Sequence, residues 1–231
     1  MKVPANMDWL VDIYNFRVVA QFAPDLVRGL VATIWISALA LSIALVVGTL
    51  TAFARLETRA GDRIGATYVQ VIRSTPLLVQ IYLIYFALPE LPLLGRRLDE
   101  FECGMLALGL NAGAYMSEII RSGIEAVPRG QVEGAKSVGM SYVQRMRYVV
   151  LPQAISKVVP PLLGQTAILV KDSSLVSFIG VFELFSAGLA ILSERLMPNE
   201  AFMTLAACYL FIYAILLFLA TQAQRRLGGA Q

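Results

Sequence analysis

The sequence predicts an all-α membrane protein with five transmembrane helices. Composition and two long uncharged stretches are the first observations that predict it. Of the 231 residues, 58% are apolar and 15% are charged, and the mean hydropathy is +0.69. Soluble domains are about 45–50% apolar and about 25% charged. Residues 29–54 and 201–224 contain no charged side chain, and as helices both reach across a hydrocarbon layer of about 30 Å.

The first span, residues 29–54, carries Thr33 and Ser37 one turn apart and Gly48 near its end. Small and hydroxylated residues favour close helix packing in lipid, where interhelical hydrogen bonds and short backbone distances hold helices together. We therefore expect this span to pack closely against another helix.

Three further spans are expected at about 70–91, 102–122 and 157–182, where apolar runs are interrupted by Gly, Pro or charged residues. Lipid offers the backbone no hydrogen bonds, so each span must be helical. Pro76 lacks a backbone N–H and favours the first turn of a helix, so we expect it at the start of the second span. Pro160-Pro161 is expected to open the fourth span for the same reason.

The basic residues predict how the spans are oriented. The segments between and beyond the spans fall into two alternating sets, one on each side of the membrane. One set, residues 55–73, 121–157 and 225–231, carries 12 Lys and Arg side chains in total, and the other set carries 6. Connections rich in Lys and Arg stay in the cytoplasm. The N-terminus is therefore expected outside, and the 225–231 tail and the 121–157 connection in the cytoplasm. An odd number of spans satisfies this arrangement.

The transmembrane domain is thus expected at 29–224, after an extracytoplasmic or interfacial segment at 1–28. Charged residues interrupt the apolar residues of that segment, so it lacks the continuous apolar core of a cleavable signal peptide. Its aromatic residues, Trp9 and Tyr14 among them, fit a helix that lies on the membrane surface.

Charged residues in the third and fourth spans are candidate transport residues. Glu118 and Arg121 lie three apart on one helix face and can pair, either as a structural ion pair or as part of a transport path. In a continuous helix Lys171 lies about 20 Å beyond Lys157. A charge at that depth costs a few kcal/mol unless it is paired or hydrated, and the adjacent Asp172 is a suitable partner. The alternative is that Lys171-Asp172 marks the outer end of a short span.

The 121–157 connection has the features of a folded surface element. Joining two helices requires about 2–8 residues, far fewer than are present. Residues 133–138 can form a short helix, Gly139 can turn the chain, and Ser141 can cap a second helix. A short helix at the membrane surface can insert in a groove of a soluble partner. This connection is therefore expected to dock another protein.

The stretch EGAKSVGMSYVQRMRYVVLP, residues 133–152, resembles the EAA loop of bacterial ABC-importer permeases. That pattern reads EAA, three residues, G, nine residues and I-x-L-P; Gly134 and Val149 replace its second Ala and its Ile. RSTPLL at 73–78, AYMSEIIR at 114–121 and KDSSL at 171–175 are similar to further signatures of the polar amino acid permeases. The resemblance extends from about residue 24 to residue 225.

The resemblance implies a type I ABC-importer permease fold with cytoplasmic EAA coupling helices, the coupling loop covering about 122–156. It also implies the partners: an identical or sister permease, cytoplasmic ATPase subunits that bind ATP and Mg²⁺, and a periplasmic or lipid-anchored binding protein that delivers an amino acid. Membrane lipids surround the complex in the bacterial inner membrane. The residues expected to couple to the ATPase are Glu133, Gly134, Ala135, Gly139, Arg145, Leu151 and Pro152.

The expected function is that of a permease subunit of an ATP-driven importer for a polar or charged amino acid. The chain is not expected to be an enzyme, since it has no GxxxxGK[ST] motif for ATP. Both charges of an amino acid need partners inside a membrane protein. The residues expected to contact substrate are Lys171, Asp172, Glu118, Gln165, Arg121 and Asn111.

Two other classes remain open: an ion-coupled secondary transporter or channel, and a structural membrane scaffold. A carrier often shows an internal repeat, and none is visible between the two halves of the chain. A scaffold leaves Lys171-Asp172 without a role. The chain has no His, and Cys103 and Cys208 are far apart, so neither a metal site nor a disulfide is expected. No nucleic-acid partner is expected either.

Overall fold

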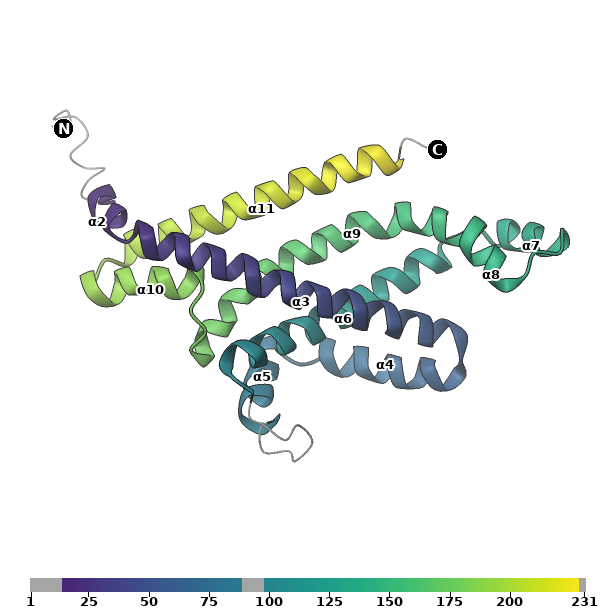
Figure 1. Cartoon of the computed structure of the whole chain (residues 1–231), viewed down its shortest axis with the longest axis horizontal. Coiled ribbons are helices and arrows are strands. Elements are labelled where there is room, and N and C mark those ends of the chain that lie inside the picture. The colour runs from purple at the N-terminus through teal and green to yellow at the C-terminus, as the bar shows by residue number, and fades with distance from the viewer. Residues whose placement is uncertain (1–13, 89–97, 229–231) are drawn as a thin grey trace.

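The computed structural model describes residues 14–88 and 98–228, and every regular element in these two ranges is a helix (Figure 1). The expected all-α fold is therefore confirmed. The helices form an elongated bundle. Figure 1 shows α2 and α10 gathered at one end and α7 and α8 at the other. The first helix of the described residues is α2, Phe16–Gln21, whose first turn is capped by the side chain of Asn15.

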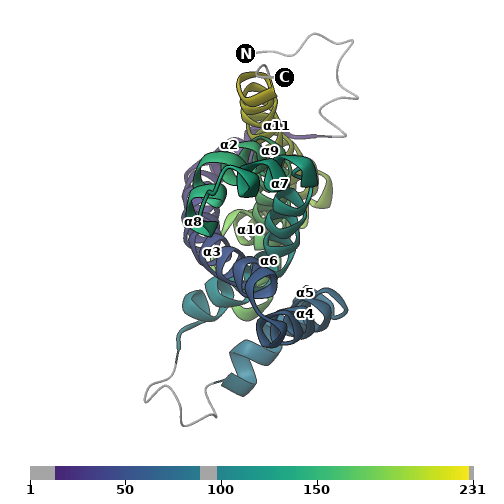
Figure 2. The same ribbon diagram turned by 90° about the vertical axis from the view of Figure 1, so that its right-hand side faces the viewer.

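Three long helices make the centre of the bundle: α3 (Ala23–Glu57), α6 (Glu100–Glu125) and α9 (Leu151–Asp172). Seen along the long axis, α11 (Pro198–Gly228) lies on one side of this centre, and α4 and α5 lie on the other (Figure 2). Only 11% of the most apolar window of α11 is buried, so most of its surface is free to face lipid or another subunit.

Helices α3 and α6 approach each other closely because small residues line their contact. A Cβ added at Gly109 would come within 2.8 Å of the Ile43 side chain, and one at Gly48 would come within 3.0 Å of the Gly113 carbonyl oxygen. Thr33 and Ser37 are buried on the same helix. The close packing expected for the first span is therefore confirmed.

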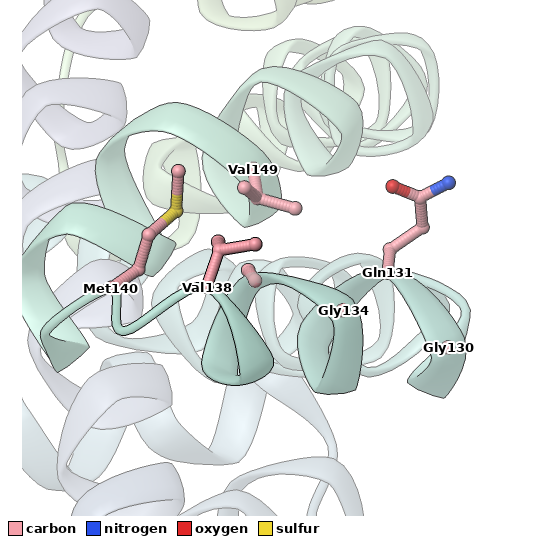
Figure 3. A pocket seen from close by; sticks show the side chains of 7 residues that line it. Gly130, Gln131, Gly134, Val138, Met140 and Val149 are labelled. Atoms are coloured by element: carbon pink, nitrogen blue, oxygen red, sulfur yellow. The ribbon is translucent and has the colours of Figure 1, made fainter.

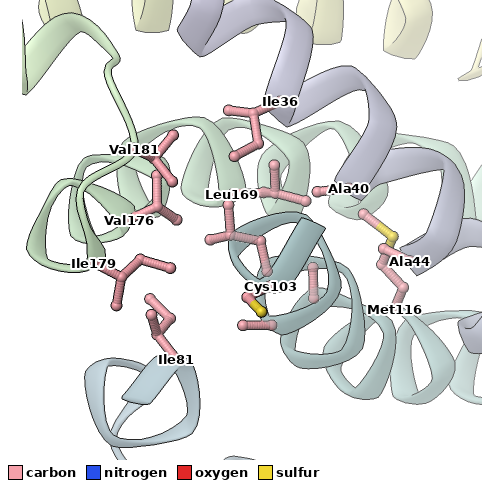
Figure 4. Packing of buried hydrophobic residues seen from close by; sticks show 13 residues of the cluster. Ile36, Ala40, Ala44, Ile81, Cys103, Met116, Leu169, Val176, Ile179 and Val181 are labelled. Carbon is pink, nitrogen blue, oxygen red and sulfur yellow. The ribbon is translucent and has the colours of Figure 1, made fainter. Parts of the chain in front are cut away.

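The largest buried cluster joins these helices near the middle of the molecule (Figure 4). Ile36 and Ala40 of α3, Met116 of α6 and Leu169 of α9 meet there with Val176. Val176 belongs to a 3₁₀ segment, Ser173–Ile179, that continues α9. This core fixes the relative positions of the predicted first, third and fourth spans.

Within the part of the chain that the structure describes, four helical segments are long and apolar enough to cross a membrane: Ala23–Glu57, Glu100–Glu125, Tyr142–Ile179 and Pro198–Arg225. They coincide with the predicted first, third, fourth and fifth spans. A fifth crossing is made only if the pair Arg59–Arg73 and Leu77–Ala87, bent by 107°, counts as one broken span.

The region of the second span differs most from the expectation. The basic connection at 55–73 is largely helix α4, Arg59–Arg73, capped by the Thr58 side chain. Its charges lie on one face and its apolar residues on the other, which stabilises a helix packed against α3 and α6. The helix after Pro76 is short: α5, Leu77–Tyr82, continues as a π-helical turn to Ala87. The predicted end of this span, at residue 91, lies outside the described residues.

One further expectation, for the fourth span, was wrong. Pro160-Pro161 lies inside α9 and does not begin it. Transmembrane helices tolerate proline where neighbours satisfy the freed backbone groups, and α6 and α11 pack along α9. Between the fourth and fifth spans lies helix α10, Leu184–Arg195. It is uniformly apolar over much of its length, so it resembles part of a longer span in sequence.

Candidate functional site

The predicted coupling loop folds as two short helices joined by a tight turn. The first is α7, Arg129–Ser137, which begins directly after Pro128. Glu133 and Gly134 are exposed on it and Ala135 is buried. Val132 packs against Val127 and Val150 of a small apolar cluster. This cluster fixes α7 to the end of the membrane-spanning bundle.

Gly139 makes the turn as predicted, with a left-handed backbone, φ +82°. Its N–H donates to the Lys136 carbonyl oxygen at 2.9 Å, and the Met140 N–H donates to the Ala135 carbonyl oxygen at 3.1 Å. These bonds satisfy carbonyl groups that the end of α7 would otherwise leave open. A side chain at Gly139 would meet no atom within 4 Å. Glycine is therefore required by backbone conformation and not by space.

The predicted cap at Ser141 is also confirmed. Its Oγ accepts from the Gln144 N–H, and its own N–H donates to Gln144 Oε1 at 2.8 Å, a reciprocal capping box. Helix α8, Tyr142–Arg145, is followed by a π-helical turn, Met146–Val150, and by α9 from Leu151 and Pro152. Arg145 donates to the Met140 carbonyl oxygen at 2.9 Å, which closes α8 back onto the glycine turn.

Two contacts hold the coupling loop to the bundle. The Tyr142 hydroxyl donates to Glu57 at the end of α3, and Lys157 Nζ donates to the Ala126 carbonyl oxygen at 2.6 Å, across the base of the loop. These hydrogen bonds join α8 to the end of α3 and α9 to the end of α6.

A hollow of about 320 Å³ opens between α7 and the Met146–Val150 turn (Figure 3). We call it the loop hollow. Val138, Met140 and Val149 point toward it, and bare backbone forms its floor at Gly134 (Figure 3). The residues that line it are Gly130, Gln131, Gly134, Ala135, Val138, Met140 and Val149.

The predicted pair of Glu118 and Arg121 exists, with Arg121 Nη2 at 2.8 Å from Glu118 Oε2. It is part of a larger ion network that the sequence did not reveal. Arg55 of α3 pairs with the other oxygen of Glu118 and lies 3.3 Å from Asp62 of α4. Arg121 also pairs with Glu125 at 2.6 Å. Glu118 is thus committed to two guanidinium groups that join α3, α4 and α6.

A glycine makes room for this network. A Cβ on Gly65 of α4 would lie 2.6 Å from Cγ and 2.8 Å from Cδ of Arg55. The Arg55 side chain therefore passes over bare backbone of α4 on its way to Glu118.

Asn111 lies buried beside the break between α4 and α5. It donates to Gln80 Oε1 at 2.9 Å, and Gln80 Nε2 donates to the Ile72 and Thr75 carbonyl oxygens at 2.7 and 3.0 Å. The Ile72 carbonyl belongs to the last turn of α4 and the Thr75 carbonyl to the break that follows it, where Pro76 prevents normal helix bonding. The structure therefore gives Asn111 a structural partner, and its predicted substrate contact stays a prediction.

Lys171 and Asp172 end α9, and the continuous helix expected between Lys157 and Lys171 is present. Lys171 is exposed and its Nζ lies 4.6 Å from the centre of the Tyr213 ring of α11. Gln165 is buried. Lys171 is the one fully exposed member of the predicted substrate set, and Asp172 beside it is partly exposed.

The structure does not gather the predicted substrate residues into one site. Glu118 and Arg121 lie beside Ile120, which packs with Val158. Lys171 lies about 20 Å beyond Val158 along α9. One amino acid cannot contact both ends at once in this arrangement.

Glu183, which sequence reasoning missed, is completely buried at the start of α10. Its carboxylate accepts from the Phe185 and Ser186 N–H groups at 2.9 and 2.8 Å and from the Tyr209 hydroxyl at 2.9 Å. Thr33 of α3 also donates to it, at 3.4 Å. One side chain thereby links α3, α10 and α11. A lone carboxylate in an apolar stretch was the sequence signal for it.

Among the described residues, no three His, Cys, Asp or Glu side chains gather as metal ligands. The two cysteines, Cys103 and Cys208, are both free.

Comparison with known proteins defines the class that this fold and loop represent. Residues 22–229 match the family model of the binding-protein-dependent transport system inner membrane component. The chain belongs to this family, and its fold is that of a type I ABC-importer permease.

The chain is similar to individual permeases over nearly its whole length. It is 37% identical over 217 residues to the glutamine transport system permease protein GlnP of Escherichia coli (strain K12), covering 93% of this chain and 98% of that one. It is 36% identical to the nopaline transport system permease protein NocM of Agrobacterium fabrum, covering 86% of each. The arginine transport system permease protein ArtQ of Bacillus subtilis is 33% identical, covering 92% and 97%.

Solved structures of related transporters agree with this family assignment. A crystal structure of an amino acid ABC transporter with histidines matches with a TM-score of 0.85 and 34% identity, over 92% of this chain and 98% of that chain. The MetNI methionine ABC transporter in an inward-facing conformation matches with a TM-score of 0.77 at 17% identity, over 90% and 98%. The second likeness concerns the fold alone.

Proposed function

We propose that this chain is the membrane-spanning subunit of an ATP-driven importer for a polar or charged amino acid. The observation that carries the proposal is the near full-length similarity to permeases named for glutamine, nopaline and arginine transport. The common chemistry of those three compounds is an amino acid backbone with a polar or charged side chain.

The coupling loop supplies the mechanism. Helix α7 stands at the far end of the bundle, is polar on its exposed face and is held rigidly by the glycine turn and the Ser141 cap. A cytoplasmic ATPase subunit that binds ATP and Mg²⁺ grips this loop. When two such subunits close on nucleotide, the loop moves, and its bonds to Glu57 and Ala126 carry the movement to α3 and α6.

Two copies, identical or sister permeases, enclose the path, and a periplasmic or lipid-anchored binding protein delivers the amino acid. The protein lies in the bacterial inner membrane with its N-terminus outside and its tail in the cytoplasm. Lys171 receives the substrate carboxylate and Asp172 its amino group, since Lys171 is exposed and Asp172 is partly exposed at the end of α9. The ion network of Glu118 and Arg121 keeps the cytoplasmic end of the same path together.

Reconstitution tests the function directly. The purified permease, its ATPase and its binding protein are placed in liposomes with ATP inside, and uptake is screened over the twenty amino acids. Uptake that requires ATP, the ATPase and the binding protein is the expected result. Uptake by the permease alone, driven by a proton or sodium gradient, would overturn the proposal in favour of a secondary transporter.

A further inference from the structure

The loop hollow is unfilled space that reaches the backbone of α7. Gly130 and Gly134 lie four residues apart, on one face of the helix. A Cβ added at either would meet no atom of the chain within 4 Å. Gly134 also stands where the EAA pattern has alanine, so this face of α7 has one methyl group fewer than that pattern would give it. The hollow can therefore admit the side chain of another molecule.

The surroundings of the hollow define the chemistry of its occupant. Val138 on its rim is 73% exposed, and Met140 and Val149 line its wall. An apolar group is favoured there. Residues 129–157 carry five basic side chains and one acidic one: Arg129, Lys136, Arg145, Arg147 and Lys157 against Glu133. A negatively charged surface around the entering group would complement them.

A protein fits these requirements better than a lipid. A helix that lies in a membrane surface presents a broad apolar face to the acyl chains. On α7 the apolar Val132 is turned into the cluster with Val127 and Val150, and the exposed positions include Gln131, Glu133, Lys136 and Ser137. The remaining apolar residue of α7, Ala135, lines the hollow, whose volume of about 320 Å³ admits a large side chain.

We propose that the loop hollow receives one large apolar side chain that projects from an acidic surface of the ATPase subunit. The inference rests on the proposed function and adds that the two proteins insert into each other. Helix α7 enters a groove of the partner, and a side chain of the partner enters the face of α7. Gly134 then selects for an ATPase that carries such a side chain.

The experiment measures the affinity of the purified full-length permease for its ATPase with Gly134→Leu, Gly134→Ala and Ser137→Leu. Leucine at Gly134 fills the hollow and is expected to weaken binding about ten- to hundredfold, the range for loss of one buried apolar side chain. Alanine is expected to weaken it less. Ser137→Leu adds the same group to the same docked helix outside the hollow and is expected to weaken binding less than Gly134→Leu does. Leucine is a better helix former than glycine, so α7 remains folded.

A photo-activated cross-linker in place of Gln131, on the rim of the hollow, identifies the occupant. A cross-link to an apolar residue of the ATPase supports the proposal, and a cross-link to phospholipid overturns it. Undiminished binding with Gly134→Leu, or an equal loss with Ser137→Leu, overturns it while leaving the proposed function intact. An ATPase that fails to bind the wild-type permease overturns the proposed function itself.

Discussion

Replacing Gly139 with valine tests whether the shape of the coupling loop transmits work. The residue has φ +82°, a conformation that costs an L-residue about 1–2 kcal/mol and that is a genuine outlier for β-branched side chains. No neighbouring atom lies within 4 Å of a Cβ at this position. The cost is therefore entirely one of backbone conformation, and it shifts the population of the correct turn about 5- to 30-fold.

The assay is the number of amino acid molecules taken up per ATP hydrolysed in liposomes that contain the whole transporter. Gly139→Val is expected to lower that ratio about 5- to 30-fold, with normal insertion in the membrane. Gly139→Asn is the matched control, because asparagine tolerates the left-handed region, and it is expected to stay near wild type. A valine variant with an unchanged ratio would refute the reasoning. Equal losses for valine and asparagine would show that the side chain matters instead of the backbone.

Three further outcomes follow from the bundle. Lys171→Met is expected to raise the KM for substrate more than tenfold with unchanged assembly of the complex; unchanged uptake would remove Lys171 from the path. Glu183→Gln places an amide NH₂ against N–H and hydroxyl donors and is expected to lower stability by about 1–3 kcal/mol, seen as a lower thermal unfolding midpoint in detergent. Gly65→Ala is expected to displace Arg55 from Glu118 and to lower the same midpoint. Its control is Gly164→Ala, where the added Cβ meets no atom within 4 Å. Equal unfolding midpoints for the two variants would contradict this account.

The sequence predicted features that depend on neighbouring residues. The charge-free runs predicted the first and fifth spans because hydropathy is summed over neighbouring residues of the sequence. The glycine turn and the Ser141 cap were predicted because their chemistry acts over a few residues. The pair of Glu118 and Arg121 was predicted from helix spacing alone.

Features that depend on distant residues were not predicted. Arg55 meets Glu118 across 63 residues of sequence, and Thr33 meets Glu183 across 150. No periodicity connects such positions. Helix α4 was missed for a different reason. Its arginines were counted only as part of a basic cytoplasmic connection, whereas Asp62 and Gly65 allow the helix to pack against α3 and α6.

The amide of Gln80 has a consequence for how this protein can move. A helix interrupted by proline normally exposes carbonyl groups that would attract water into the membrane. Here one side chain satisfies the Ile72 and Thr75 carbonyls, and Asn111 holds that side chain from α6. The break between α4 and α5 thus has its free carbonyl groups hydrogen-bonded and is tied to α6. We therefore expect α4, α5 and α6 to move together during transport, and the hinges of that motion to lie outside this break.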